Sequence, residues 1–224
     1  MSAKLIHWLS QFSIRKFGGE FINPREESAL AACASLMLAS QSDFYDRPMP
    51  FVDIPEEISK LQALTDLTIS CQKLSGVEYL KTNRKLTKIS LLNVEVIPSE
   101  ILEIESLEEL NLTNCGDFKP IDIDSRLKHL SVSLDNPDSA DFYRLSSFMG
   151  RIESLESLSI NCRYPRLDIP FSLGNFKYLK HLSVGNWYWR EFSGELFPIE
   201  INGLDDIIRP LTSLQTIRLL SIRT

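Results

Sequence analysis

One short apolar frame recurs seven times along most of this chain. In each copy an apolar residue is followed by a second one three positions later and by a third one five positions later. The first residues of the copies are Leu64, Leu86, Leu107, Leu127, Leu155, Leu179 and Leu214. They are spaced by 22, 21, 20, 28, 24 and 35 residues, and such a period indicates an array of stacked supersecondary units. The chain is therefore predicted to form a solenoid, in which each repeat buries its apolar residues against its neighbours.

The end of each frame is predicted to be a β-strand. Successive side chains of a strand point to opposite faces, so in the first copy Leu67 and Ile69 are expected to point into the core. Asp66, Thr68 and Ser70 are then expected on the other face, which is the concave face of the curved solenoid. The seven copies predict an α/β fold with about seven parallel strands on this face and irregular or helical segments on the convex side.

A second phrase, which contains a proline, precedes three of the frames. Its copies read Ile54-Pro55-Glu56-Glu57-Ile58, Ile97-Pro98-Ser99-Glu100-Ile101 and Ile169-Pro170-Phe171-Ser172-Leu173. Together the frame and this phrase resemble the intracellular leucine-rich repeat proteins of bacteria and plants. The resemblance extends from about residue 54 to residue 224 and implies a leucine-rich repeat solenoid that binds a protein partner. Ubiquitin ligases of this family carry a separate catalytic domain with a C-x-D motif, which this chain lacks, so the resemblance implies no enzyme.

The chain is predicted to divide into an N-terminal helical cap, residues 1–50, and the solenoid, residues 51–224. The first helix carries an apolar stripe at helical spacing, formed by Leu5, Trp8, Leu9 and Phe12. Asn23 and Pro24, followed by two glutamates, predict the start of a second helix that reaches about Ala39. Trp8 and Met37 are expected to pack in the core, and residues 40–55 to form a connector. Insertions are predicted at about 135–153, with a helix over 139–149, and at about 186–212.

The composition of the chain limits the kinds of partner that the protein is expected to bind and the cellular compartment in which it is expected. A net charge of −6 and a pI near 5.2 argue against a nucleic-acid surface. The longest basic cluster is expected to solvate a convex face: Lys81, Arg84, Lys85 and Lys88. No export signal is seen, and the longest apolar stretch, residues 29–39, falls short of the roughly 20 residues that cross a bilayer. Four widely spaced cysteines predict no disulfide cap. The expected location is the cytoplasm, or a host cytoplasm for an effector, with no membrane partner.

The concave face is the first predicted binding surface. Its central column of side chains is small and polar in six of seven positions: Thr68, Ser90, Asn111, Ser131, Ser159, Ser183 and Arg218. The column before it has mixed charge: Asp66, Lys88, Glu109, His129, Ser157, His181 and Thr216. Hydroxyl groups beside charges suit hydrogen bonds to a protein partner. The residues predicted to bind the partner are Lys88, Ser90, Glu109, Asn111, His129, Ser131, Ser159, His181 and Ser183. The alternative is a solvated inner face.

Metal binding and catalysis are not predicted. His129 and His181 share a column but lie two strands apart, about 10 Å, which is too far for one zinc ion. Three cysteines and three asparagines follow the strands at one repeat position and are expected to hydrogen bond to the neighbouring turns. They are Cys71, Cys115, Cys162, Asn93, Asn114 and Asn186. No catalytic residue, metal ligand or cofactor is therefore assigned.

Two features near the C-terminus complete the predicted surfaces. The run Trp187, Tyr188, Trp189 and Arg190 consists of residue types that dominate interface hot spots. It is predicted to bind the partner together with the concave face, or alternatively to fold the insertion onto its own repeat. The last strand presents an uncovered edge, so Arg218, Leu220 and Ile222 are predicted to mediate self-association.

The sequence thus predicts a non-catalytic protein–protein interaction module, and it leaves open the roles of effector, immunity protein and adaptor. The alternative is a structural self-assembly module, a homodimer formed through the uncapped C-terminal repeat.

Overall fold

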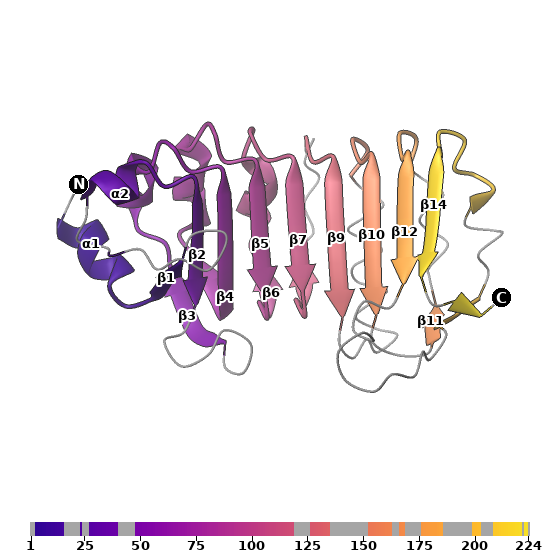
Figure 1. Ribbon diagram of the computed structural model, residues 1–224, viewed down its shortest axis with the longest axis horizontal. Coiled ribbons are helices and arrows are strands. Elements are labelled where there is room, and N and C mark those ends of the chain that lie inside the picture. Colours follow the sequence, from indigo (N-terminus) through magenta and orange to yellow (C-terminus); the bar gives the residue numbers. More distant parts are fainter. Residues whose placement is uncertain are drawn as a thin grey trace.

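The computed structural model describes residues 3–15, 23, 27–39, 48–118, 126–134, 152–162, 166–168, 176–185, 199–202, 208–220 and 222–223. Nine strands of its main sheet lie side by side in the order β1, β2, β4, β5, β7, β9, β10, β12, β14, and β3 pairs with β4 (Figure 1). The bounds of these strands are β1 Ser13–Arg15, β2 Ser35–Ala39, β3 Met49–Asp53, β4 Asp66–Ser75, β5 Lys88–Leu92, β7 Glu109–Thr113, β9 His129–Leu134, β10 Ser157–Cys162, β12 His181–Gly185 and β14 Thr216–Leu220.

The apolar frame sets the register of the parallel strands. From β4 to β14 every strand pairs in parallel with the next, and the second frame residue of each repeat lies opposite that of its neighbour. This row is Leu67, Ile89, Leu110, Leu130, Leu158, Leu182 and Ile217. All but Ile217 are buried, in one continuous core cluster. The fold is therefore a parallel-stranded solenoid of the kind that the leucine frames predict.

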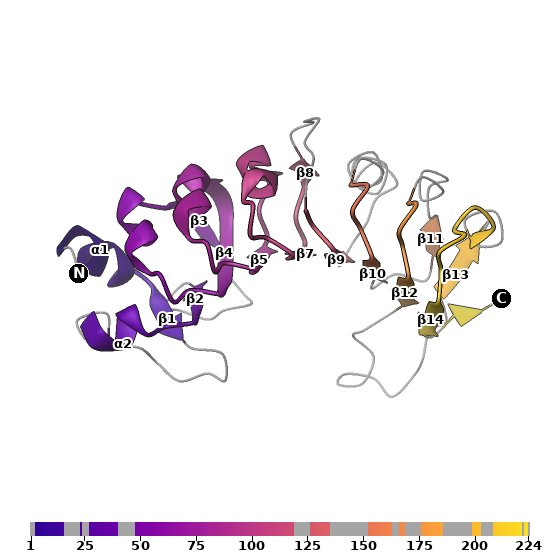
Figure 2. The same ribbon diagram turned by 90° about the horizontal axis from the view of Figure 1, so that it is seen from above.

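Seen from above, the strands from β4 to β14 lie along an arc, and the coiled segments that connect β4, β5 and β7 lie on its outer, convex side (Figure 2). Three short 3-10 helices lie there: η1 (Glu56–Lys60), η2 (Val77–Thr82) and η3 (Ser99–Glu103). Two small parallel ladders follow further along. One pairs β6 (Val96–Ile97) with β8 (Asp117–Phe118), and the other orders β11 (Arg166–Asp168), β13 (Ile199–Asn202) and β15 (Ile222–Arg223).

The N-terminal segment departs from the predicted pair of helices. Helix α1 (Ala3–Leu9) is present, with Leu5 and Leu9 buried, and α2 covers Glu27–Ala31. The predicted extension of the second helix to Ala39 is wrong, because Ser35–Ala39 is strand β2. This strand pairs in parallel with β4 and antiparallel with β1. Alanine, leucine and methionine favour helices intrinsically, but pairing along the edge of β4 overrides that preference here.

Strand β2 reveals an eighth copy of the apolar frame, Cys33-x-x-Leu36-x-Leu38, whose three apolar residues are buried. Met37, expected in the core, instead lies in register with Thr68 and is half-buried. The connector predicted over residues 40–55 is also wrong in part, since β3 pairs in parallel with the second half of β4. The sheet therefore extends into residues 1–50.

Side chains join successive repeats at the turns that enter the strands. Ser106 donates a hydrogen bond to the Leu86 carbonyl at 2.8 Å, Ser154 to Leu127 at 2.8 Å, and Ser213 to Lys177 at 2.7 Å. Buried Asn83 makes a related link, because its amide nitrogen lies 3.0 Å from the Leu61 carbonyl one repeat earlier. These bonds link the entry turn of each repeat to the backbone of the preceding one.

Of the asparagines and cysteines singled out in the sequence, Asn93, Asn114 and Cys115 lie in the turns that follow β5 and β7. The asparagines there adopt an unusual backbone conformation, and the cysteine forms a side-chain hydrogen bond. Asn93 and Asn114 adopt positive φ angles of 62° and 51°, a conformation that asparagine tolerates better than most residues. Their backbone N–H groups donate to the next repeat, at Thr113 and Ser133. The thiol of Cys115 donates to the Leu91 carbonyl at 3.3 Å, which confirms the predicted link for this residue.

Parts of the predicted insertions lie outside the described residues. This applies to the helix expected over 139–149, to Asn186 and to most of the segment 186–212, of which β13 and residues 208–212 are described. Among the described residues, no helix is long and apolar enough to cross a membrane.

Candidate protein-binding surface

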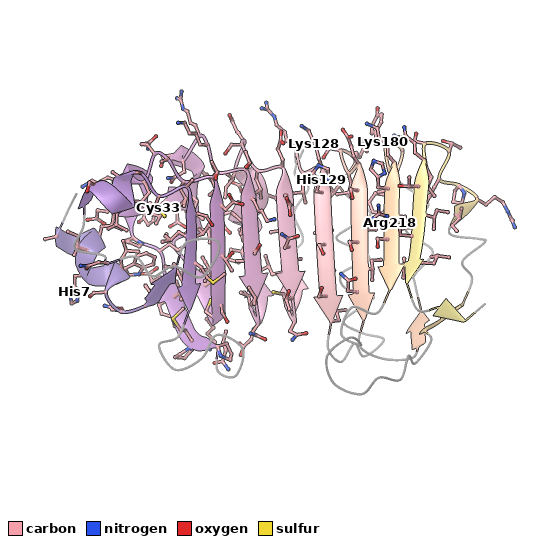
Figure 3. The ribbon with its side chains drawn as sticks, in the orientation of Figure 1. His7, Cys33, Lys128, His129, Lys180 and Arg218 are labelled. Carbon is pink, nitrogen blue, oxygen red and sulfur yellow. The ribbon has the colours of Figure 1, made fainter. Side chains whose placement is uncertain are left out.

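The sheet register brings the two predicted concave columns together as continuous rows. Ser90, Asn111, Ser131, Ser159 and Ser183 lie opposite one another in consecutive strands. In the row before them, Lys88 lies opposite Glu109, which lies opposite His129, and Ser157 lies between His129 and His181. All these side chains are half-buried or exposed, as expected for the open face of a one-layer sheet. Figure 3 shows His129 near the start of β9 and Arg218 on β14.

Three ion pairs are described on the concave face and along the adjacent edge of the sheet. The ammonium group of Lys88 lies 2.8 Å from the Glu109 carboxylate on the neighbouring strand. One residue earlier in each repeat, Lys128 lies 2.8 Å from Glu108 and Lys180 lies 2.6 Å from Glu156. Exposed ion pairs of this kind contribute about 0–1 kcal/mol to stability. Their larger effect is to leave the face close to neutral, so it offers hydrogen bonds more than net charge.

Polar side chains of both columns are linked by hydrogen bonds as well. The Asn111 amide donates to the Glu109 carboxylate at 3.0 Å and to the Ser90 hydroxyl at 3.3 Å. A ring nitrogen of His181 lies 2.6 Å from the Thr216 hydroxyl. Such bonds, within a strand and between strands, hold the side chains in place before a partner binds, which lowers the entropy lost on binding.

Glu109 is the described concave carboxylate with the most direct contacts. Burial by itself raises the pKa of Glu109, but hydrogen bonds from Lys88 and Asn111, together with the positive charge of Lys88, outweigh burial. The pKa therefore lies below its ordinary value of 4.5. A carboxyl whose pKa is lowered on folding stabilises the fold above its unfolded pKa, and this contribution is lost as the pH falls through the folded pKa.

We therefore expect Glu109→Gln to unfold more easily than the parent at pH 7. The expected loss is at most about 1 kcal/mol, because the carboxylate is partly exposed and screened by solvent. The difference should shrink once the pH falls below 4.5 and vanish below the folded pKa. Urea unfolding at pH 7, 5 and about 3 measures it. A difference that stays constant over this range would show that the carboxylate charge has no role.

Sequence reasoning missed some members of this surface. Met37 extends the central column by one strand, and the only signal for it was the frame that begins at Cys33. The pairs of Lys128 with Glu108 and of Lys180 with Glu156 were also missed, since they precede the strands that defined the columns. Lys128 and Lys180 lie along one edge of the sheet (Figure 3). Their signal was an alternation of sign from one repeat to the next.

Of the other residues predicted to form binding surfaces, some lie within the described ranges and some lie outside them. Trp187, Tyr188, Trp189 and Arg190 lie outside the described residues, so their role stays a prediction. Arg218 is exposed on β14, with its row neighbour Ser183 on β12. Leu220 and Ile222 belong to β14 and β15, and nothing further is described of their side chains.

The basic cluster is divided between two faces of the molecule. Lys81 pairs with Glu103 on the convex side, whereas Lys88 pairs with Glu109 on the concave side. Arg84 and Lys85 are exposed between them.

Buried thiols of the solenoid are kept protonated. Burial raises the pKa of Cys71 to about 12, with a smaller contribution from Cys115. Burial likewise raises the pKa of Cys115 to about 11, against backbone hydrogen bonds that lower it. A thiol acts as a nucleophile through its thiolate, so neither residue is suited to that role near pH 7. Within the described ranges, no group of three or more His, Cys, Asp or Glu side chains is placed to hold a metal ion.

Comparison with known proteins adds a distant structural likeness. No family model matches the chain, and no curated protein matches it. Among solved structures, the chain is similar to internalin C2 from Listeria monocytogenes, with 13% sequence identity over 97% of this chain and 92% of that one. The TM-score is 0.41. The description of the fold therefore rests on the strand register and the buried frames.

Proposed function

We propose that the protein is a non-catalytic interaction module that binds a protein partner across its concave face. The observation that carries this proposal is the register of the two polar columns. Seven consecutive parallel strands place side chains of the same kind in straight, solvent-accessible rows. A solenoid presents an extended concave surface of this type because each repeat contacts only its neighbours, and its inner side chains stay open.

The chemistry of the rows favours a polar and nearly neutral partner surface. The hydroxyl and amide groups of the central column both donate and accept hydrogen bonds. Lys88 with Glu109 forms a neutral unit beside them. Interfaces also need larger side chains that supply buried area, and two described residues supply them at the ends of the column. Met37 lies at the N-terminal end and Arg218 at the C-terminal end.

Affinity capture with matched baits tests this function. The wild type, a concave variant carrying Ser131→Arg and Ser159→Arg, and Gln72→Arg as a control would be exposed to an extract of the source cells. Gln72 is exposed and lies outside both columns. We expect a protein that the wild type and the control retain and the concave variant loses. With the purified partner, the two arginines should weaken binding by at least about tenfold through steric and desolvation penalties. Equal capture by all three baits would contradict concave binding.

The second candidate function, self-assembly through the last described repeat, has its own supporting observation. Ile217 and Leu219 occupy frame positions that are buried in the preceding repeats, yet 40% and 38% of their surfaces are exposed. Among the described strands, β14 pairs with β12 along one edge only. Exposed apolar residues on a strand with an open edge favour pairing with another chain.

Light scattering over a wide range of protein concentration distinguishes this candidate. Self-assembly predicts a mass that doubles with concentration, and Leu219→Asp should abolish the increase because it places a charge in the contact. Ser131→Arg, on the concave face, should leave the mass curve unchanged. A monomer at every concentration would dismiss the second candidate and leave the concave face as the proposed site.

A further inference from the structure

A groove opens on the convex side between the second and third described 3-10 helices. Its volume is about 410 Å³, and its lining comes from the end of β4, the start of η2, β6 and the start of η3. Leu74 and Val96 contribute apolar walls, and 45% of the surface of Val96 is exposed. Gly76 and Pro98, the residues that precede the two helices, also line it. Gly76 and Pro98 occupy equivalent positions in successive repeats, each directly before its 3-10 helix.

Two carboxylates lie in the lining of this apolar groove. Glu78 is the second residue of η2 and Glu100 the second residue of η3, so they occupy equivalent positions in successive repeats. Glu78 is exposed, and Glu100 is half-buried and accepts a hydrogen bond from the Ser99 hydroxyl at 3.1 Å. Lys73, the residue before Leu74 on β4, is exposed and is not among the residues that line the groove. The groove thus combines an apolar surface with negative charge.

The same position in the preceding repeat already binds a lysine. Glu57 is the second residue of η1, and its carboxylate lies 3.4 Å from the ammonium group of Lys4 in α1. Helix α1 contacts η1, and Leu5, the residue after Lys4, is buried. Figure 2 shows α1 at the N-terminal end of the arc, on the side of the 3-10 helices. The pair of Lys4 with Glu57 is therefore a precedent within the chain for a lysine at the second residue of a 3-10 helix.

We propose that the convex groove binds a short amphipathic segment of a partner protein, in which a lysine precedes an apolar residue as Lys4 precedes Leu5. The apolar residue contacts Val96 and Leu74. The hydrocarbon stem of the lysine lies along the same walls, and its ammonium group pairs with Glu78 and Glu100. This surface lies on the opposite side of the sheet from the concave columns, so the proposal stands or falls separately from the proposed function.

A synthetic peptide with the sequence of residues 2–12 is the probe, because it carries the Lys4 and Leu5 pair. It is titrated into the isotope-labelled full chain, and amide chemical shifts are followed by NMR. We expect saturable shifts at Gly76, Glu78 and Val96 with a Kd below about 1 mM. A peptide carrying Lys4→Glu should give no saturable shift at these amides. Equal binding of the two peptides would overturn the proposal.

Variants of the full chain separate the groove from other sites. Glu78→Gln combined with Glu100→Gln should weaken binding about fivefold or more, the range expected for loss of exposed ion pairs. Glu105→Gln is the matched control, since Glu105 is exposed and outside the groove lining. Shifts confined to η1 and α1 would show that the peptide only replaces α1, and would overturn the proposal. A mass increase with concentration that the double variant abolishes would assign the groove to a second copy instead.

Discussion

Gly76→Ala is expected to lower the free energy of unfolding by about 3–5 kcal/mol, an unusually large effect for adding one methyl group. Gly76 has a φ of +74°, which costs an L-residue about 1–2 kcal/mol. A Cβ atom at this position would lie 2.0 Å from the carbonyl oxygen of Ile54. Since that oxygen belongs to the backbone of the preceding repeat, no side chain can move to make room. The two repeats must separate or the turn must change.

Gly116→Ala is the matched control for this prediction. Its Cβ would lie 2.3 Å from the carbonyl oxygen of Glu95, so it meets the same kind of backbone obstacle. Gly116 is not among the residues with a positive φ, and we expect its substitution to cost less than that of Gly76 by about the left-handed strain. Urea unfolding followed by circular dichroism measures both. A Gly76→Ala protein as stable as the parent would mean that the turn adapts freely.

Leu110→Ala is expected to destabilise the protein by about 3–5 kcal/mol, the range seen when a buried leucine leaves a cavity. Leu110 is buried between β5 and β9, with Ile89 and Leu130 in the same row. Because repeats on both sides contact it, collapse around the cavity would disturb two interfaces. The measurement is again urea unfolding, with the midpoint and slope compared to those of the parent.

Ile217→Ala, in the same row, is the control. With 40% of its surface exposed, Ile217 loses less buried area, and we expect a loss of only about 1 kcal/mol. Comparable losses at the two positions would show that the last repeat is covered in solution. Since a second copy would cover Ile217 as well as a segment of the same chain would, the mass by light scattering at the same concentration decides between the two.

The strands of the solenoid were predictable because one pattern determines both their location and their register. Once Leu67 and Leu110 are assigned to the core, the period of two places Thr68 and Asn111 on the open face. The register of the sheet confirms that assignment from β4 to β14. That this face binds a partner stays a prediction, since a row of polar side chains has the same pattern whether it binds a protein or water.

The N-terminal strand and the convex groove were not predictable in this way. Cys33 replaces the leucine that marks the other frames, and the residues after it favour a helix locally, so only pairing with β4 reveals β2. The pairing of Lys4 with Glu57 joins residues far apart in the sequence. The turn at Gly76 has only one signal in the sequence, which is that Gly76 stands where the next repeat has Pro98. Each depends on tertiary contacts, which a local pattern does not encode.

The ion pairs along the edge of the sheet bear on how the chain avoids misassembly. Because every repeat carries the same apolar frame, the core alone would accept a strand that skipped its neighbour and packed against the next one. The charges at the entrance of four successive strands alternate: Glu108, Lys128, Glu156 and Lys180. Skipping one repeat would place two glutamates or two lysines side by side, and like charges on adjacent strands repel. The alternation thus disfavours skipped pairings among these four otherwise interchangeable repeats.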